Sequence, residues 1–132
     1  VGGILYLYDA TRAKWLSVAS HQYTAALSGT SIKSSYLSVD GVSMSSTTGY
    51  VMPWNGTIVG LAGASVASNS QTLCVYKSGT SVASVSWSNS LTVYSDAINI
   101  DFSAGDVLSL YISGVGNNCN NPLAYFSAKR RI

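Results

Sequence analysis

The chain has 132 residues, of which 47% are hydrophobic and only 9% carry a charge. Nine Tyr and three Trp supply enough apolar surface to exclude a disordered chain, because burying them offsets the entropy lost on folding. The net charge is only +2 and no run of about 18 apolar residues occurs, so we expect neither a nucleic-acid partner nor membrane insertion.

The length is typical of one domain, and we expect residues 1–132 to share a single core. The first residue is Val1 rather than Met and no leader sequence is recognisable, which favours a processed protein or a fragment of a longer one. A basic cluster over residues 129–131 is either a solvated terminus or a patch for an anionic ligand.

Short alternating segments separated by Gly, Ser, Asn and Asp predict an all-β chain, because no segment keeps the 3.6-residue rhythm of a helix. In chain order, the predicted strands are residues 3–8, 13–18, 22–27, 35–39, 57–67, 71–77, 81–87, 97–102, 106–113 and 122–129. Asn55-Gly56 is a tight-turn dipeptide before the fifth strand, and residues 42–49 are expected to form a long surface connection. About ten short strands favour a two-sheet antiparallel sandwich or jelly roll.

The predicted strand at residues 57–67 has no polar face, although antiparallel sheets normally leave one face to water. We expect one row of this strand to point into the core, namely Ile58, Gly60, Ala62, Ala64 and Val66. The alternate row then faces a neighbouring chain or an overlying segment, and the reverse assignment stays open.

Residues 106–113 and 122–129 are also apolar on both faces. A monomer would expose these faces to water, so the pattern predicts self-association through one sheet. The candidate interface residues are Val59, Leu61, Gly63, Leu108, Leu110, Tyr111, Tyr125 and Phe126.

The two cysteines, Cys74 in a predicted strand and Cys119 in an Asn-rich loop, leave two interpretations open. They form a disulfide, or they remain small free thiols in the core. A zinc site is not expected, because His21 is the only histidine and zinc requires four clustered ligands.

Two motifs, GYVMPWNGTI from residue 49 and FSAGDVLSL from residue 102, resemble the C1q/TNF-like trimeric heads that end phage tail fibres and collagen-like bacterial proteins. The segment YDATRAKWLSV resembles the stretch that precedes such heads, so residues 1–20 are expected to form an N-terminal hairpin or a stalk-proximal segment. The resemblance implies a jelly-roll homotrimer without enzymatic activity, at a virion surface (tail fibre or spike tip) or an extracellular or cell surface. Eukaryotic receptor chemistry is not carried over, because the chain has two Phe and no Glu.

Catalysis is not expected from the acidic residues. Glycan hydrolysis typically requires two carboxyl groups at a controlled separation, one of them with a raised pKa, and the chain holds only five Asp. Asp9, Asp40 and Asp106 occupy predicted turns, and His21 lies outside any Gly-x-Ser-x-Gly motif. A tailspike-like hydrolase remains an alternative function.

Sugar binding fits the aromatic and amide side chains better, although Trp54 and Trp87 are also candidates for the core. The candidate ligand residues are Trp54, Asn55, Trp87, Asn89, Tyr94, Asn117, Asn118 and Asn120. The chain is therefore expected to bind a receptor or surface glycan, and a monomeric carbohydrate-binding module is the alternative. No cofactor is expected. Two interpretations stay open for Asp96 with Asn99 and for the Asn cluster of residues 117–121: they hold structural calcium, or they are ordinary turn residues.

Overall fold

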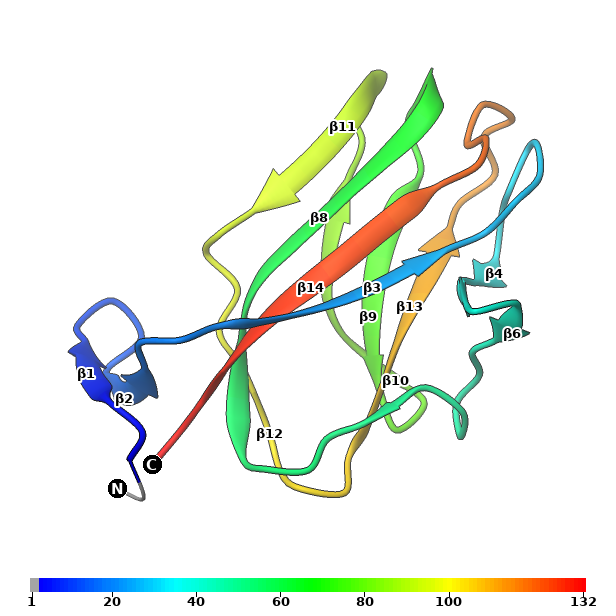
Figure 1. The fold of residues 1–132 in the computed structure, drawn as a ribbon. Coiled ribbons are helices and arrows are strands. Elements are labelled where there is room, and N and C mark those ends of the chain that lie inside the picture. Colours follow the sequence, from blue (N-terminus) through cyan, green and yellow to red (C-terminus); the bar gives the residue numbers. More distant parts are fainter. Residues whose placement is uncertain (1–2) are drawn as a thin grey trace.

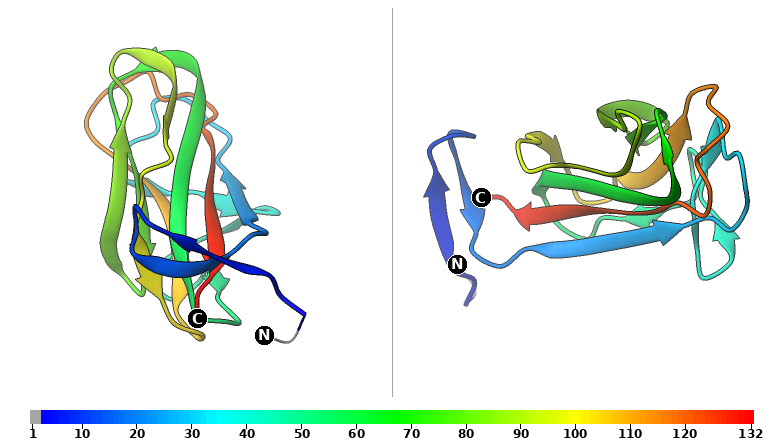
Figure 2. Two further views of the ribbon diagram at one scale, coloured as in Figure 1. Left: turned by 90° about the vertical axis from the view of Figure 1, so that its left-hand side faces the viewer. Right: turned by 90° about the horizontal axis from the view of Figure 1, so that it is seen from above.

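The computed structural model describes residues 3–132, which form antiparallel strands and, within that range, no helix (Figure 1). Two sheets pack face to face as a sandwich, and a two-stranded hairpin stands beside one end of it (Figure 2). Val1 and Gly2, which the expected domain included, lie outside the described residues. In residues 3–132 no helix exists that would be long and apolar enough to cross a membrane.

The first sheet is built from β3 (His21–Ala26), β5 (Ser38–Val39), β6 (Val42–Ser43), β8 (Gly56–Asn69), β11 (Ser90–Ser95), β12 (Ile100–Phe102) and β14 (Leu123–Arg130). Its strand order is β11-β8-β14-β3-β5-β6. Because β8 has 14 residues, its length accommodates β11 along one half and β12 along the other.

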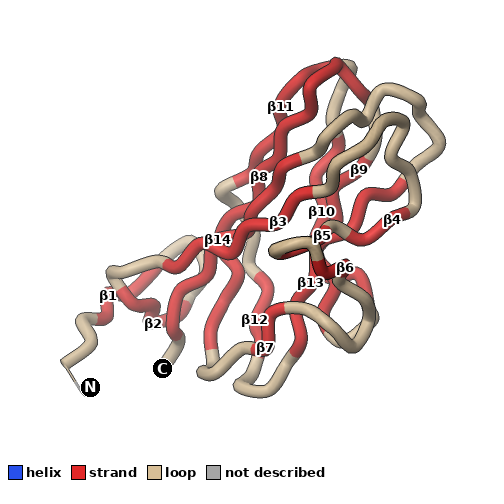
Figure 3. Tube along the Cα trace, turned by 45° about the vertical axis from the view of Figure 1, so that its right-hand side comes forward, coloured by secondary structure: helices blue, strands red, loops and turns tan. Residues whose placement is uncertain are grey.

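The second sheet contains β4 (Ser35–Tyr36), β7 (Tyr50–Val51), β9 (Thr72–Lys77), β10 (Thr80–Ser86) and β13 (Val107–Ser113). Its order is β10-β9-β13-β4, and β7 pairs with β13 on the same side as β4 (Figure 3). The separate hairpin consists of β1 (Tyr6–Asp9) and β2 (Lys14–Ser17).

Early strands of the chain pair with late ones. β3 lies beside β14, β4 beside β13, β8 beside β11, and β9 beside β10. The first and second halves of the chain therefore run side by side as one long antiparallel ribbon, and the β9–β10 hairpin is the turn that joins the two halves. Ser78 and Gly79 turn this hairpin with φ values of 48° and 88°, a conformation that Gly adopts without steric cost.

Every strand predicted from the sequence overlaps a strand of the structure, but four local features differ, one of which is the unpredicted two-residue strand β7. The predicted strand at residues 35–39 divides at Leu37, where the chain crosses from the second sheet to the first. The expected surface connection at residues 42–49 begins with the short strand β6. The strand β11 was not predicted, because its only alternation, LTVY, follows a Ser-Asn-Ser turn.

The core lies between the two sheets and is built from alternate residues of the long strands. Phe102, Phe126, Leu108 and Leu110 are at most 1% exposed, and the indole of Trp87 closes one end of the same cluster. Burying a side chain of this size contributes about 1.5–3 kcal/mol, so this cluster supplies the main stabilisation of the sandwich.

A β-bulge in β8 decides which residues face the core. Ser127 pairs with Gly60 and Ala128 pairs with Ile58, so Val59 is an extra residue without a partner in β14. A bulge shifts the alternation by one position. Ile58 therefore points inward, as predicted, but beyond the bulge the inward residues are Leu61, Gly63 and Ser65. The prediction that Ala62 and Val66 share the core row with Ile58 is wrong, and Val66 is 69% exposed.

Both cysteines are free and buried, so the disulfide interpretation is wrong. Cys74 lies in β9, and Cys119 belongs to the core cluster although polar residues surround it in the sequence. Burial raises the pKa of both thiols, which keeps them protonated and weakly reactive.

Candidate functional site

The outer face of the first sheet is an apolar surface with a groove. Two cross-strand rows form it: Thr92, Ala64, Leu123 and Ala26, and next to them Tyr94, Ala62, Tyr125 and Thr24. Small side chains at the centre of the sheet and larger ones on both sides create a groove of about 360 Å³. Its lining holds no charged residue. Tyr94 is 80% exposed and Leu123 is 52% exposed.

The structure places the eight predicted interface residues in different parts of the molecule. Leu61, Leu108, Leu110 and Phe126 lie in the core of the single chain with exposures of 0–1%. Their side chains therefore offer no surface to a second chain. The sequence pattern did not reveal this, because strands that are apolar on both faces do not indicate which face is inside.

The remaining four interface residues do not form one surface either. Gly63 lies at the floor of the groove, but a Cβ there would point into the core, 3.0 Å from the side chain of Leu73 and 3.0 Å from the ring of Trp87. Tyr125 borders the groove, while Tyr111 points outward from the second sheet. Val59 is the bulge residue, and its carbonyl accepts a hydrogen bond from Arg12. Sequence reasoning missed Ala62, Ala64 and Leu123, which line the groove.

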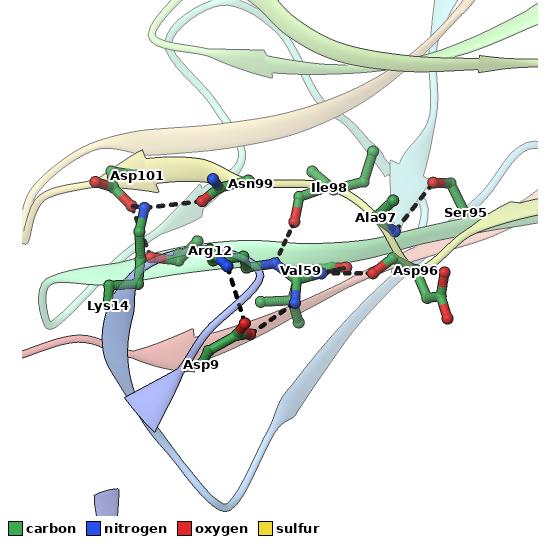
Figure 4. A network of polar contacts seen from close by, with 11 residues as sticks. Asp9, Arg12, Lys14, Val59, Ser95, Asp96, Ala97, Ile98, Asn99 and Asp101 are labelled. Carbon is green, nitrogen blue, oxygen red and sulfur yellow. Dashed lines mark hydrogen bonds and ion pairs between the residues drawn. The ribbon is translucent and has the colours of Figure 1, made fainter. Parts of the chain in front are cut away.

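Arg12 holds the N-terminal hairpin against the sandwich (Figure 4). Its Nε donates to the carbonyl of Ile98 at 2.7 Å, and one terminal nitrogen donates to the carbonyls of Val59 at 3.0 Å and Asp96 at 2.5 Å. Its other terminal nitrogen pairs with Asp9 at 2.8 Å, and this hydrogen bond holds the pKa of the Asp9 carboxyl below its ordinary value. One guanidinium thus joins β1 and β2 to the bulge of β8 and to the connection before β12.

Asp101 is the second anchor of the hairpin. Lys14 donates to it at 2.8 Å and Thr57 at 2.7 Å, while Arg131 lies 3.6 Å away. Partial burial works against the charged form of this carboxyl, but the hydrogen bonds from Lys14 and Thr57 outweigh it, so the pKa is lowered. Lys14 also donates to Asn99 at 2.8 Å, and Figure 4 shows both acceptors on the same stretch of chain.

The predicted ligand residues are not brought together. Trp54 and Asn55 precede β8, whereas Asn89 and the Asn cluster of residues 117–121 lie beyond its opposite end (Figure 1). Trp87 is 2% exposed and its indole nitrogen donates to the carbonyl of Leu91, so its assignment to a ligand site is wrong. The side chain of Tyr94 belongs to the groove of the first sheet.

The other candidate ligand residues tie loops to one another. Asn55 accepts a hydrogen bond from the backbone of Ala104 at 2.9 Å, and Asn120 accepts one from the backbone of Ser31 at 2.9 Å. Backbone carbonyls of Asn117 and Asn118 accept hydrogen bonds from Ser31 and Ser65. Trp54 packs between His21 and Phe102, under the guanidinium of Arg130 at 5.2 Å. The side-chain amides of Asn55 and Asn120 therefore have a structural use, whereas Asn117 and Asn118 take part through their main chain.

Two of the side-chain oxygens considered for calcium likewise accept hydrogen bonds. Asn99 accepts the hydrogen bond from Lys14, and Asn121 accepts one from the backbone of Gly29 at 2.8 Å. Within residues 3–132, no three His, Cys, Asp or Glu side chains gather in a group that would hold a metal ion.

A cluster of three tyrosines, Tyr36, Tyr76 and Tyr111, lies on the outer face of the second sheet. Sequence reasoning did not identify it, because the three residues come from three strands that are distant in the sequence. The available signal was the position of each Tyr next to an inward-facing Leu, Val or Ile.

Comparisons of this chain with protein-family models, with curated proteins and with solved structures gave no match, so the fold and the surfaces described above carry the functional argument.

Proposed function

We propose that the chain is a non-enzymatic jelly-roll head that assembles as a homotrimer through the outer face of its first sheet. The observation that carries this proposal is the uncharged groove between Tyr94 and Tyr125, floored by Ala62 and Ala64. A face with exposed Tyr, Leu and Val side chains and no charge in its groove is typical of a protein interface.

The pairing of strands supports the jelly-roll fold. The strands β3, β4, β8 and β9 pair respectively with β14, β13, β11 and β10, which is the folding of one antiparallel ribbon into two four-stranded sheets. Two Greek keys of this kind define a jelly roll. The extra strands β5, β6, β7 and β12 extend the edges and ends of the two sheets.

The small residues of the groove support close approach of another copy of the chain. Ala62 and Ala64 leave space between the larger side chains, and Val66 continues the apolar row beyond them with 69% exposure. A closed, symmetric assembly removes such a face from water in every copy. The hydrophobic gain from this burial is the driving force that we propose for assembly.

The carboxyl groups support a non-enzymatic head. A general acid requires a raised pKa, whereas hydrogen bonds lower the pKa of Asp9 and, against the effect of burial, also that of Asp101. Asp106 accepts a hydrogen bond from the backbone of Ser103, as a turn residue does. Asp40 also lies in a turn, with φ of 50°.

The sequence resemblance is the basis for the position that we propose in a larger assembly. It favours a head at the end of a phage-like fibre or a collagen-like stalk, exposed at a virion or cell surface, where it contacts a receptor or glycan. The hairpin of β1 and β2, anchored by Arg12 and Lys14, is then the segment nearest to the stalk.

Light scattering coupled to size exclusion tests the assembly. We expect a molar mass of about three times the 13.8 kDa of one chain. Ala62→Arg places a charge in the groove, so we expect it to yield monomers with an unchanged circular dichroism spectrum. Val115→Arg, at a loop position that is 90% exposed, is the matched control and should remain trimeric. A 13.8 kDa wild-type protein would overturn the trimer and favour a monomeric carbohydrate-binding module.

A further inference from the structure

The outer face of the second sheet carries the tyrosine cluster defined above. The ring centroids of Tyr36 and Tyr111 are 4.8 Å apart, those of Tyr76 and Tyr111 are 5.1 Å apart, and those of Tyr36 and Tyr76 are 5.7 Å apart. Each ring thus contacts the other two, and each side chain is half-buried. Because three adjacent strands supply the rings, the sheet holds them in fixed positions (Figure 3).

Hydroxyl groups surround this cluster. The outward strand positions alternate with core residues such as Leu73, Val75 and Leu110, which are fully buried. The Ser and Thr residues at these outward positions are Thr72, Ser81, Ser84, Ser86, Ser109 and Ser113. Two of them, Thr72 and Ser86, lie 2.9 Å apart and share a hydrogen bond. Val51 and Val107 end the face on one side.

No outward strand position of this face carries a charged residue in the described chain. Lys77 follows Tyr76 but directs its amine to the carbonyl of Asp101, in β12 of the first sheet. The face therefore differs from the groove of the first sheet. It combines aromatic rings with many hydroxyls, whereas the groove is lined by Ala, Gly, Val, Leu and Tyr with a single Thr.

A buried hydroxyl group without a hydrogen-bond partner, that of Ser109, lies next to the tyrosine cluster. The Ser109 side chain is 1% exposed, lies directly opposite Tyr76 in the register, and its hydroxyl has no hydrogen-bond partner. Buried hydroxyls without a partner are uncommon, because each costs about 1–3 kcal/mol.

We propose that this tyrosine face binds a neutral glycan. Aromatic rings provide apolar plates for the C–H faces of sugar rings. The surrounding Ser and Thr hydroxyls, apart from that of the buried Ser109, match the hydroxyls of a sugar as donors and acceptors. The lack of charge disfavours anionic polysaccharides and nucleic acids, which are attracted to basic residues. The scarcity of aliphatic side chains disfavours a protein partner, whose binding centre is usually apolar.

The glycan site deepens the surface-binding part of the proposed function but does not depend on the trimer. It lies on the sheet opposite the proposed interface, so a trimer would present three copies outward and bind a repeating polymer with increased avidity. A monomeric protein could therefore still bind the glycan, and a trimer could fail to bind it, so the binding test and the assembly test give separate results.

Affinity electrophoresis through gels that contain dextran, mannan, xylan or galactan tests this proposal, with heparin and alginate as anionic comparisons. We expect retardation by at least one neutral polymer and none by the anionic ones. Tyr76→Ala and Tyr111→Ala should each weaken the retardation about tenfold. Tyr111→Phe keeps the ring and should retain most of the affinity. Tyr8→Ala, an exposed tyrosine of the hairpin, is the matched control and should bind as the wild type does.

Thermal melting and light scattering of every variant separate binding from folding and assembly. Lack of retardation by all neutral polymers would overturn the proposal, as would equal retardation of the wild type and both Ala variants. Retardation by heparin or alginate alone would also overturn it, and would point to the basic residues 129–131.

Discussion

At Gly56 the main chain enters β8 with no room for a side chain. A Cβ atom there would lie 2.5 Å from the carbonyl oxygen of Lys129 and 2.5 Å from the ring of Phe102. We expect Gly56→Ala to lower the free energy of unfolding by about 1–3 kcal/mol, because this part of the core would have to shift. Urea denaturation measures the change. Gly116→Ala, whose Cβ would lie 3.6 Å from Gln71, should be nearly neutral, and equal losses for both variants would contradict the argument.

The free thiols of Cys74 and Cys119 provide a second test at the level of single residues. Both are buried and burial raises the pKa of each, so neither should react with a thiol reagent until the protein unfolds. We expect two thiols per chain to be titrated in denaturant and none in the native state. The melting temperature should be unchanged by reductant, whereas a decrease would reveal a disulfide.

Among the structural elements, the β1–β2 hairpin depends on Arg12. Without this side chain, the partly buried carbonyls of Val59 and Ile98 and the exposed carbonyl of Asp96 lose a donor. An unpaired group that is fully buried costs about 1–3 kcal/mol, and we expect a smaller loss for these carbonyls. We expect Arg12→Ala to speed hydrogen exchange in residues 6–17 while the β9–β13 pairing stays protected. Arg12→Lys should restore only part of the protection, because an amine lacks the planar fork of a guanidinium. Uniformly faster exchange would argue for a global role instead.

Acid should weaken the same hairpin. The pKa of Asp101 is lowered in the folded protein, so the unfolded chain binds the proton first as the pH falls. Its stabilising contribution is complete above the ordinary Asp value of about 3.9 and disappears as the pH falls through the lowered pKa. We expect the melting temperature to decrease below about pH 4, and Asp101→Asn to reduce this pH dependence. An Asp101→Asn profile identical to that of the wild type would contradict the assignment of the acid effect to this carboxyl group.

For the whole molecule, self-association should appear in the melting temperature. A trimer is stabilised by mass action, so the melting temperature should rise with protein concentration over about a hundredfold range. Ala62→Arg should remove this dependence and lower the melting temperature toward that of the isolated chain. A melting temperature independent of concentration in the wild-type protein would contradict assembly through the groove.

The sequence predicted the positions of the strands far better than it predicted which residues contact one another in the folded chain. Strand positions depend on local alternation and on turn residues, and every predicted strand overlaps an observed one. β11 was missed because its alternation is short and its stability comes from pairing with β8. Trp87 was a ligand candidate, although a tryptophan beside Ser and Asn in the sequence reaches the core when the sheets close over it.

By itself, the sequence determined the all-β class, the antiparallel hairpins and the position of every predicted strand, because these depend on interactions between near neighbours in the chain. Only the tertiary structure decided which side of each strand is inside. The extra residue Val59 reverses the alternation of β8, and this bulge exists only in the pairing with β14, whose residues lie more than sixty positions later. The same long-range pairing collects the groove on one sheet and the tyrosine cluster on the other, since residues from distant strands share a surface only after the ribbon has folded.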